Sequence, residues 1–387
     1  MIGWIHKLES EEFDFLEDWA KKQFNEMDSD IAIKLLESAV DKGNGLQTFL
    51  KDRREVAKEL GKELMKKGVI RRAKEDVALT EVFRNALAVG VDSSRQAPWR
   101  VLSTHYCPVT SAVVYFDGIN SKATYDPGCP CKFYEEANMT PEEFARKIEE
   151  EMYRCEVSAI ARVSSVVESL SKSKKEILLM IDGPIIDPPN KALYKGYVKE
   201  RVNAVLACAE NNVLVIGCVK SMEGHHFLNF LKRDDKFAEL ASVAEGFGPD
   251  TQLVPFVFSG IRSTGAAFQT VPIEILDPDW LIKEYKDAGF RRIYRIFLTL
   301  GGRGAPFGVE FLVREEEDSD QIGEKVCTAV RAWGIPGLNA PLPVIAAHRR
   351  CNIRKGASEY LYRQLLTRAL SWEGGADILE PITGGRI

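Results

Sequence analysis

The chain has 387 residues, of which 45% are hydrophobic and 28% are charged, and its formal net charge is −5. This length gives room for about two to three average domains, or for one large domain with insertions. The sequence contains no apolar run of about 18 residues or more, which excludes a membrane-spanning helix. The first residues lack the apolar core of a signal peptide, and we therefore expect a cytoplasmic protein.

The eight cysteines are scattered along the chain, which excludes a secreted disulfide framework and a zinc ribbon. Only Cys129 and Cys131 are close neighbours in the sequence, in a loop rich in proline and glycine. We expect most of the thiols to be reduced and buried. The sequence leaves the role of the Cys129 and Cys131 pair open.

The first 80 residues predict an N-terminal helical arm. Apolar residues recur with helical spacing over residues 10–40 and 45–80, and Gly43-Asn44-Gly45 separates the two stretches. Basic residues between Arg53 and Lys74 alternate with glutamates, which fits a solvated helix face and a DNA-binding face about equally well. The arm could serve in dimer contact, DNA guidance or partner docking, and the sequence does not choose among them.

Residues 81–387 predict an α/β domain that begins with three strands. A buried apolar run leads from Ala86 to Asp92. An extended stretch from Val101 to Phe116 follows, with a turn signal near Cys107-Pro108. We expect these segments to form a meander in which two strands lie beside the first.

The next segments alternate between helix and strand. Thr140, Pro141 and Glu143 have the pattern of a helix start with a capping box. The expected elements are a helix from Thr140 to about Ser171, a strand from Ile177 to Ile181, a helix from Lys191 to Asn211 and a strand from Val213 to Lys220. This order is typical of an RNase H-like core, in which a mixed five-stranded sheet is flanked by helices.

The domain is expected to carry an insertion at about residues 221–290, partly helical and rich in turn signals. Two strands, 292–300 and 308–314, follow and are joined by Gly301-Gly302-Arg303-Gly304. This group lacks the G-x-x-x-x-G-K-[ST] pattern and does not lead into a helix. It therefore predicts a hairpin loop and not a phosphate-binding loop.

Two carboxylates stand at the carboxyl ends of predicted core strands. Asp92 ends the first strand and Asp182 ends the strand after the long helix. Topology makes these strand ends neighbours, and hard anionic oxygens aimed into one cleft are the ligands that a divalent metal needs. An isolated buried carboxylate is unfavourable by several kcal/mol, so partners or a metal must compensate it.

The helix before Asp182 is expected to supply a third ligand. The strand covers about 20 Å, and a helix that runs back over the same distance needs about 13 residues. Counting from a helix end near Ser171 leads close to Glu156, which we prefer, with Glu168 as the alternative. His348, on or just before a terminal helix, is the fourth candidate.

Several motifs resemble those of the NurA nucleases of prokaryotic DNA-end processing. They are V-D-S-S after the first strand, L-M-I-D-G-P-I at the second, V-I-G-C-V-K ending at Lys220, and P-L-P-V-I-A-A-H followed by R-R-C-N-I. The resemblance spans residues 86 to about 360. It implies an RNase H-like fold and manganese-favouring DNA cleavage, as a 5′ to 3′ exonuclease and single-strand endonuclease. It also implies a homodimer that engages a HerA-type hexameric translocase in DNA end resection and double-strand break repair.

Position by position, the resemblance makes Asp92 and Asp182 metal ligands, Glu156 the helix carboxylate and His348 the late ligand. Two Mn²⁺ or Mg²⁺ ions about 4 Å apart, bridged by Asp92, would activate water and stabilise the leaving oxygen. Lys220 would offset the charge that develops on the phosphate. We expect Arg349 and Arg350 to hold the DNA backbone with little base specificity.

Two alternatives remain open. An actin-like ATPase or sugar kinase also has an aspartate at the end of its first strand, but that site needs D-x-G-[ST], and D-S-S-R lacks the glycine. The other alternative is a non-catalytic DNA-binding or scaffold subunit that keeps the fold and loads a translocase.

Overall fold

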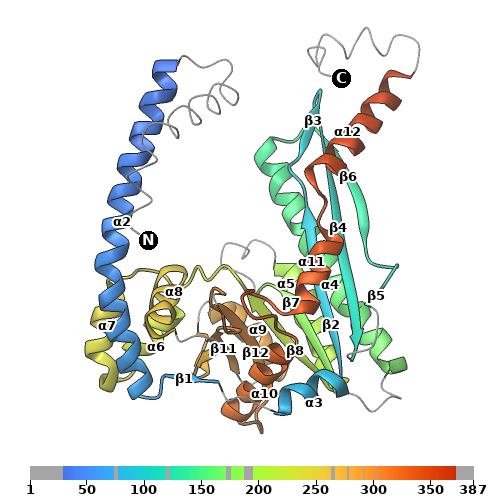
Figure 1. Ribbon diagram of the computed structural model, residues 1–387. Coiled ribbons are helices and arrows are strands. Elements are labelled where there is room, and N and C mark those ends of the chain that lie inside the picture. Colours follow the sequence, from blue (N-terminus) through green and yellow to red (C-terminus); the bar gives the residue numbers. More distant parts are fainter. Residues whose placement is uncertain are drawn as a thin grey trace. The chain divides into compact units, whose positions relative to one another are not determined.

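A computed structural model describes residues 29–73, 77–118, 123–170, 176–186, 195–262, 266–276, 279–290, 292–302 and 304–371 (Figure 1). The chain divides into two compact units, Met1–Glu59 and Leu60–Ile387. Within the described ranges, no helix is both long and apolar enough to cross a membrane.

A single helix, α2 (Ser29–Lys66), runs without a break through Gly43-Asn44-Gly45. The predicted interruption there is wrong, because an interior glycine costs a helix only about 1 kcal/mol and does not by itself end it. The helix ends at Lys66 and not near residue 80, in a Schellman arrangement. Gly68 adopts a positive φ of 75°, and the amide of Val69 donates to the carbonyl of Leu64 at 2.9 Å. The expected helix over residues 10–28 lies outside the described part of the chain.

The RNase H-like core is confirmed. The strand β2 (Ala86–Arg95) pairs antiparallel with β4 (Thr104–Asp117) and parallel with β7 (Glu176–Asp182). Beyond them lie β6 (Cys131–Ala137), antiparallel to β4, and β8 (Val213–Val219), parallel to β7. The resulting order β6-β4-β2-β7-β8 is a mixed five-stranded sheet, as expected, but its fifth strand, β6, lies after the stretch in which the sequence predicts two strands.

Cys107-Pro108 does not form the predicted turn, because both residues lie inside β4. The pairing between β2 and β4 stops at Arg95 and Val109. On the side of β4 that faces β2, Pro108 therefore lies beyond the end of the β2–β4 ladder. Its missing N–H interrupts no ladder hydrogen bond there. One long strand replaces the expected meander of two short ones.

The sheet continues past β8 through the predicted hairpin, whose strands are β11 (Arg292–Leu298) and β12 (Phe307–Val313). β12 pairs antiparallel with β8. Short strands complete a twelve-stranded sheet: β1 (Ile70–Arg72), β3 (Trp99–Val101), β5 (Thr124–Tyr125), β9 (Phe268–Thr270) and β10 (Ile273–Glu274). The RNase H-like strands thus form one part of a wider sheet.

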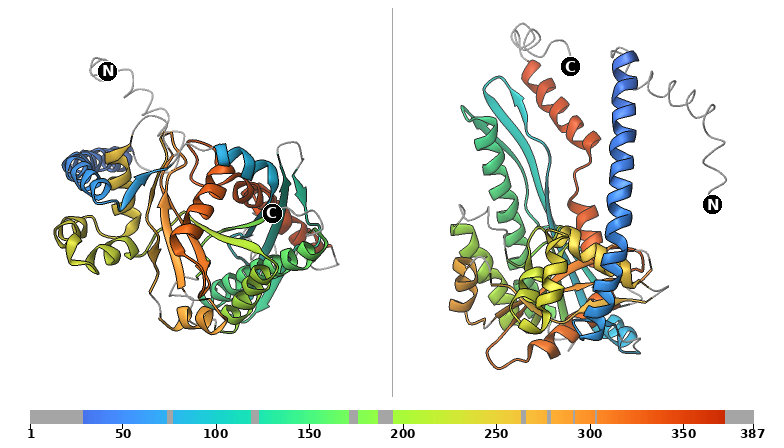
Figure 2. Two further views of the ribbon diagram at one scale, coloured as in Figure 1. Left: turned by 90° about the horizontal axis from the view of Figure 1, so that it is seen from below. Right: turned by 90° about the vertical axis from the view of Figure 1, so that its left-hand side faces the viewer.

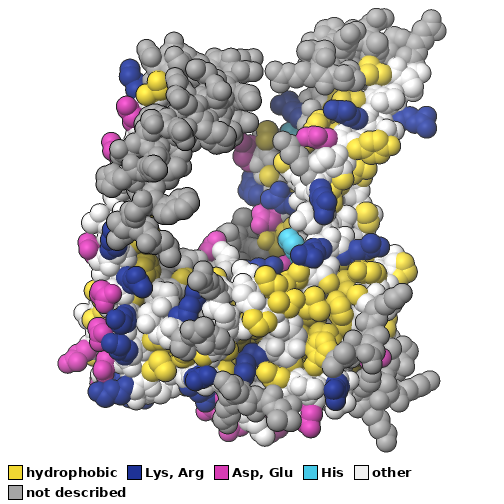
Figure 3. Space-filling view, in the orientation of Figure 1, with side chains coloured by type: hydrophobic (Ala, Val, Ile, Leu, Met, Phe, Trp, Pro, Cys, Tyr) yellow, Lys and Arg dark blue, Asp and Glu magenta, His cyan; other side chains and the backbone are white. Residues whose placement is uncertain are grey.

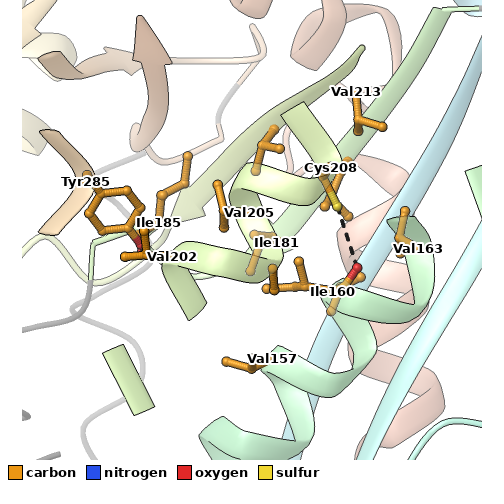
Figure 4. Close-up of a cluster of buried hydrophobic side chains, with 14 of the residues drawn as sticks. Val157, Ile160, Val163, Ile181, Ile185, Val202, Val205, Cys208, Val213 and Tyr285 are labelled. Carbon is orange, nitrogen blue, oxygen red and sulfur yellow. Dashed lines mark hydrogen bonds between the residues drawn. The ribbon is translucent and has the colours of Figure 1, made fainter. Parts of the chain in front are cut away.

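Helices cover both faces of this sheet (Figure 2). On one face lie α4 (Pro141–Leu170), α5 (Lys195–Glu210) and α9 (Asp279–Asp287), and on the other α3 (Val77–Asn85), α10 (Ser319–Ala332) and α11 (Leu342–Cys351). Figure 4 shows how Val157 of α4 and Val202 of α5 contribute to the apolar layer on the first face. The predicted capping box begins α4, with the Glu143 amide donating to the Thr140 hydroxyl at 3.2 Å.

The segment 221–290, where the sequence predicts a partly helical insertion, is largely helical. Its helices are α6 (His226–Lys232), the 3-10 turn η4 (Asp235–Phe237), α7 (Ala238–Glu245), α8 (Asp250–Ile261) and α9. The last helix of the described chain is α12 (Lys355–Leu370). The segment is more than a surface insertion, because β9 and β10 within it extend the main sheet.

Candidate metal centre

Three elements bring the central side chains together. Val91 of β2 pairs with Ile181 of β7 in the parallel ladder, so the next residues, Asp92 and Asp182, leave the two strand ends as neighbours. The helix α11 adds His348 from the opposite side. It can lie close to β2 because Gly90 has no side chain, and a Cβ there would overlap the backbone of Pro343 in the first turn of α11.

These three side chains form a compact donor group. Nδ1 of His348 lies 2.9 Å from Oδ2 of Asp92 and 3.5 Å from Oδ2 of Asp182. One donor atom from each residue lies within 4.8 Å of the other two. Asp92 is only 5% exposed, and its Oδ1 accepts a hydrogen bond from the Ser93 amide at 2.7 Å. Two carboxylate oxygens and an imidazole nitrogen are a donor set suited to a divalent ion such as Mn²⁺.

Lys220 lies beside the group, at the end of β8. Its Nζ donates to Oδ2 of Asp182 at 2.7 Å. A metal held by Asp182 would therefore bind beside this ammonium group. The expected location of Lys220 at the acidic site agrees with this contact.

Glu156 of α4 also reaches the cleft, but it is paired differently. Its Oε1 accepts from Nη1 of Arg201 at 2.6 Å, and its Oε2 accepts from the Ser93 hydroxyl at 3.2 Å. Both charged side chains are almost fully buried, with residue exposures of 6% for Glu156 and 1% for Arg201. The donor group of Asp92, Asp182 and His348 does not include Glu156. The side chain of the alternative, Glu168, lies outside the described residues.

The guanidinium of Arg201 holds more than the glutamate. It donates to the carbonyls of Pro184 and Ile185 at 2.7 and 3.1 Å. These carbonyls belong to the turn that follows Asp182. Arg201 therefore fixes the helix carboxylate and the chain after the second aspartate to one another.

A second buried ion pair supports the same turn from the sheet. Glu310 of β12 is fully buried and pairs with Arg295 of β11. Its other oxygen, Oε2, accepts from the amides of Ile185 and Ile186 at 2.7 and 3.1 Å. Neither Arg201 nor this pair is predicted from the sequence. A single charged residue in a helix or strand carries no periodic signal that separates a buried ion pair from a solvated side chain.

Crowding of carboxylates in the buried cleft changes their acidity. Burial, followed by the charges of Asp182 and Glu156, raises the pKa of Asp92 to about 7. Burial also raises the pKa of Asp182, while the Lys220 ammonium opposes that rise. The Cys351 thiol, 3.2 Å from Oδ2 of Asp92, has a pKa well above its usual range because it is buried beside this carboxylate. Burial, together with the neighbouring carboxylates, thus disfavours the charged forms of these groups, and a divalent cation would favour them.

The donor group lies at a cleft of about 810 Å³. Its charged lining residues include Asp92, Glu156, Asp182, Arg201, Lys220, Arg295 and Glu310. Figure 3 shows acidic and basic side chains gathered around a histidine near the middle of this face. Arg349 and Arg350 are exposed in the last turn of α11, and the guanidinium of Arg350 lies 4.5 Å from the ring centre of Tyr125. The site is thus an acidic centre with cationic side chains beside it.

Three crystal structures of NurA proteins are similar to this chain. The crystal structure of the NurA nuclease from Sulfolobus solfataricus matches with a TM-score of 0.52 at 15% identity, over 90% of this chain and 100% of that one. A crystal structure of NurA matches at 10% identity and a TM-score of 0.47, covering 88% of this chain and 99% of that one. A crystal structure of NurA with manganese matches at 11% identity and a TM-score of 0.42, covering 86% and 99%. The search of curated proteins found no match.

The family comparison covers the core of the chain. The model of the NurA domain matches residues 87–353, which is more than half of the sequence. This range begins in β2, just before Asp92, and ends just after α11, which carries His348. All three members of the donor group therefore fall inside the matched range. The chain belongs to the NurA family.

Proposed function

We propose that this protein is a metal-dependent DNA nuclease that hydrolyses phosphodiester bonds, as a 5′ to 3′ exonuclease and a single-strand endonuclease. The observation that carries the proposal is the convergence of Asp92, Asp182 and His348 within 4.8 Å beside a cleft that also holds Lys220. Family membership supports the same reading. The proposed role is DNA end resection in double-strand break repair.

Asp92, Asp182 and His348 would hold the metal, which we propose to be Mn²⁺ or Mg²⁺. A bound divalent ion polarises the phosphoryl oxygens and lowers the pKa of water. The proposed second ion would need a further ligand, and Oε2 of Glu156 is our candidate because among the described residues it accepts a hydrogen bond from the Ser93 hydroxyl but forms no ion pair. Arg201 restrains the other oxygen and so points this carboxylate at the cleft.

The remaining cations serve the nucleic acid. Lys220 lies where it can neutralise charge on a phosphate that approaches Asp182. Arg349 and Arg350 are exposed on the helix that carries His348, and we assign them to backbone phosphates. The predicted DNA contacts are therefore electrostatic, and binding should weaken as salt increases.

The proposed assembly is a homodimer that acts with a HerA-type hexameric ATPase. This proposal rests on membership of the NurA family. Size measurement by light scattering, alone and with such an ATPase, tests it: a monomer at working concentration or a lack of association contradicts it.

A nuclease assay tests the catalytic proposal. Labelled single- and double-stranded DNA is incubated with Mn²⁺, Mg²⁺ or EDTA. Asp92→Asn and Asp182→Asn remove one charge each at nearly constant shape, and Asp287→Asn, an exposed residue at the end of α9, is the matched control. Cleavage should require the metal and fall by at least about 10²-fold in both site variants, while the control keeps full activity. A wild type that is inert with every metal, or an active Asp92→Asn, contradicts the proposal.

A further inference from the structure

A cationic pocket lies away from the acidic metal centre. It has a volume of about 400 Å³. Its positive side chains come from three separate parts of the chain: Lys67 after α2, Arg233 and Lys236 around η4, and Arg292 at the start of β11. We call it the Lys67 pocket. None of the residues assigned to the metal centre or to DNA contacts above lines it.

The charges in this pocket are unbalanced. Among the described residues, two carboxylates, Asp234 and Glu274, line it beside the four cations. Asp234 pairs with Lys236 at 2.6 Å, and Glu274 lies 3.6 Å from Arg292. The lining therefore carries an excess of two positive charges, although the whole chain has a net charge of −5. Local positive excess against an acidic background favours an anionic ligand.

Two ammonium groups converge on one aromatic ring. Nζ of Lys236 lies 4.6 Å and Nζ of Lys67 lies 5.8 Å from the ring centre of Phe237. Lys67 also donates to the backbone carbonyl of Lys236. Each ammonium group therefore lies within about 6 Å of the same ring centre. An anion bound beside this buried ring would be attracted by both charges.

The position of the pocket indicates which phosphate it meets. The helix α6 separates it from the metal cleft, since Asn229 lines the cleft and the next residue, Phe230, lines the pocket. The end of β10 also lies between them, with Glu274 lining the pocket and the next residue, Ile275, lining the cleft. On β11, Tyr294 lines the pocket and Arg295 lines the cleft, so the two sites lie on opposite faces of the sheet at this edge. A helix is about 10–12 Å across, so a nucleic-acid strand that leaves the cleft would reach the pocket by passing around this edge beside α6.

We propose that the Lys67 pocket is a second contact for DNA, which binds backbone phosphates of the single strand that extends from the metal cleft. The proposal rests on the proposed DNA nuclease function, because it takes the strand in the cleft as its ligand. Partly exposed Phe230 gives a base next to the phosphates an apolar surface. The contact would lengthen the stretch of DNA that the protein holds without reading its sequence.

Binding measured without catalysis tests the pocket. Fluorescence anisotropy of a labelled single strand of about 30 nucleotides is recorded in EDTA over a range of salt concentrations. The variants are the double change Lys67→Gln with Lys236→Gln, and the single change Arg292→Gln on a separate element. Lys286→Gln, an exposed lysine of α9 outside the pocket, is the control. Melting curves check that all the variants remain folded.

Loss of two phosphate contacts should lower the slope of log affinity against log salt by about 1.4, since each contact on a single strand contributes about 0.7. Arg292→Gln should lower it by about half as much, and Lys286→Gln should leave it unchanged. Unchanged slopes in both pocket variants overturn the proposal. Binding of thymidine monophosphate and of inorganic phosphate is measured in parallel. If the variants lose these ligands but keep the oligonucleotide slope, the pocket is a small-anion site and the proposal is also overturned.

Cleavage then separates this pocket from the metal centre. With Mn²⁺, the double variant should lose several-fold in kcat/KM on the long strand and keep its activity on bis(4-nitrophenyl) phosphate, which is too small to reach the pocket. An equal loss on both substrates would mean that the change acts through the metal centre and would overturn the proposal. A wild type that cuts neither substrate contradicts the nuclease function, whereas the anisotropy slopes still decide whether the pocket binds DNA.

Discussion

The close packing of α11 on β2 depends on a single glycine, and its replacement gives a strict test of how the metal centre is built. In Gly90→Ala the new Cβ would lie 3.1 Å from the Cα of Pro343 and nearer still to the carbonyl carbon and oxygen of that residue. A carbon normally stays about 3.3–3.6 Å from a carbonyl oxygen. The backbone of residue 90 fixes the position of the Cβ, and the atoms that it meets are backbone atoms of Pro343. No side chain can therefore turn aside, and α11 must move away by about 1 Å.

This displacement acts on two properties. Overpacking of this kind costs about 1–3 kcal/mol of unfolding free energy, and the variant should therefore unfold at lower urea concentration. The displacement of α11 also moves His348 away from Asp92. In the wild type, Nδ1 of His348 lies 2.9 Å from Oδ2 of Asp92. A 1 Å misplacement of a reacting group can cost about 10²-fold in rate. We therefore expect weaker Mn²⁺ binding by calorimetry and a loss of nuclease activity on that scale, under conditions where the variant is still folded.

Gly356→Ala is the matched control. Gly356 lies near the start of α12, and apart from its chain neighbours and the backbone of its own helix, no atom of the described residues lies within 4 Å of an added Cβ. Alanine there should be neutral or should stabilise the helix by up to about 1 kcal/mol. If Gly90→Ala matches the wild type in urea midpoint, Mn²⁺ affinity and activity, α11 is not held against β2 in the way that we describe.

Three further predictions concern the charges of the cleft. Arg201→Met leaves Glu156 buried without its cation, and the unfolding free energy measured by urea titration should fall by about 3–5 kcal/mol. Adding Glu156→Gln to this variant should recover part of the lost stability. No recovery would contradict the pairing. Lys220→Met removes a competitor for Oδ2 of Asp182, so Mn²⁺ should bind more tightly by calorimetry while turnover falls, and weaker binding would contradict this. The pKa of Asp92 is raised from 3.8 to about 7, so this group makes the metal-free protein less stable as pH rises from about 4 to 7. Because a proton must leave Asp92 when Mn²⁺ binds, Mn²⁺ affinity should fall below pH 7. An affinity that does not change between pH 5 and 8 would contradict this prediction.

The sequence predicts those parts of the site that local pattern and topology determine. Apolar strands that end in a single carboxylate identify Asp92 and Asp182, and the order of strands and helices makes the two strands neighbours in a parallel ladder. Helix geometry leads to Glu156, because the rise per residue fixes how far a helix runs back along a strand. The structure places this carboxylate in the cleft. These steps need no knowledge of side-chain packing.

The unpredicted parts depend on contacts between distant residues. Arg201 reaches Glu156 across 45 positions of sequence, and Arg295 pairs with Glu310 across two strands of the outer hairpin. A charged residue inside an amphipathic helix looks the same whether it faces water or a buried partner. The helix α2 also continues through Gly43 against the prediction. A local helix penalty of about 1 kcal/mol does not decide whether a helix of 38 residues forms.

The pairing of charges explains why Asp92 is the residue most dependent on a metal. Four buried or nearly buried carboxylates line the cleft, and three of them have a basic partner: Arg201 for Glu156, Lys220 for Asp182 and Arg295 for Glu310. Among the described residues, Asp92 has only the His348 imidazole, the Cys351 thiol and the Ser93 amide. An imidazole supplies a full positive charge only when protonated, so the ionised form of Asp92 is incompletely compensated. A divalent ion at this position would stabilise the charge that the protein leaves uncompensated, and metal binding would thereby also stabilise the closed packing of β2, β7 and α11.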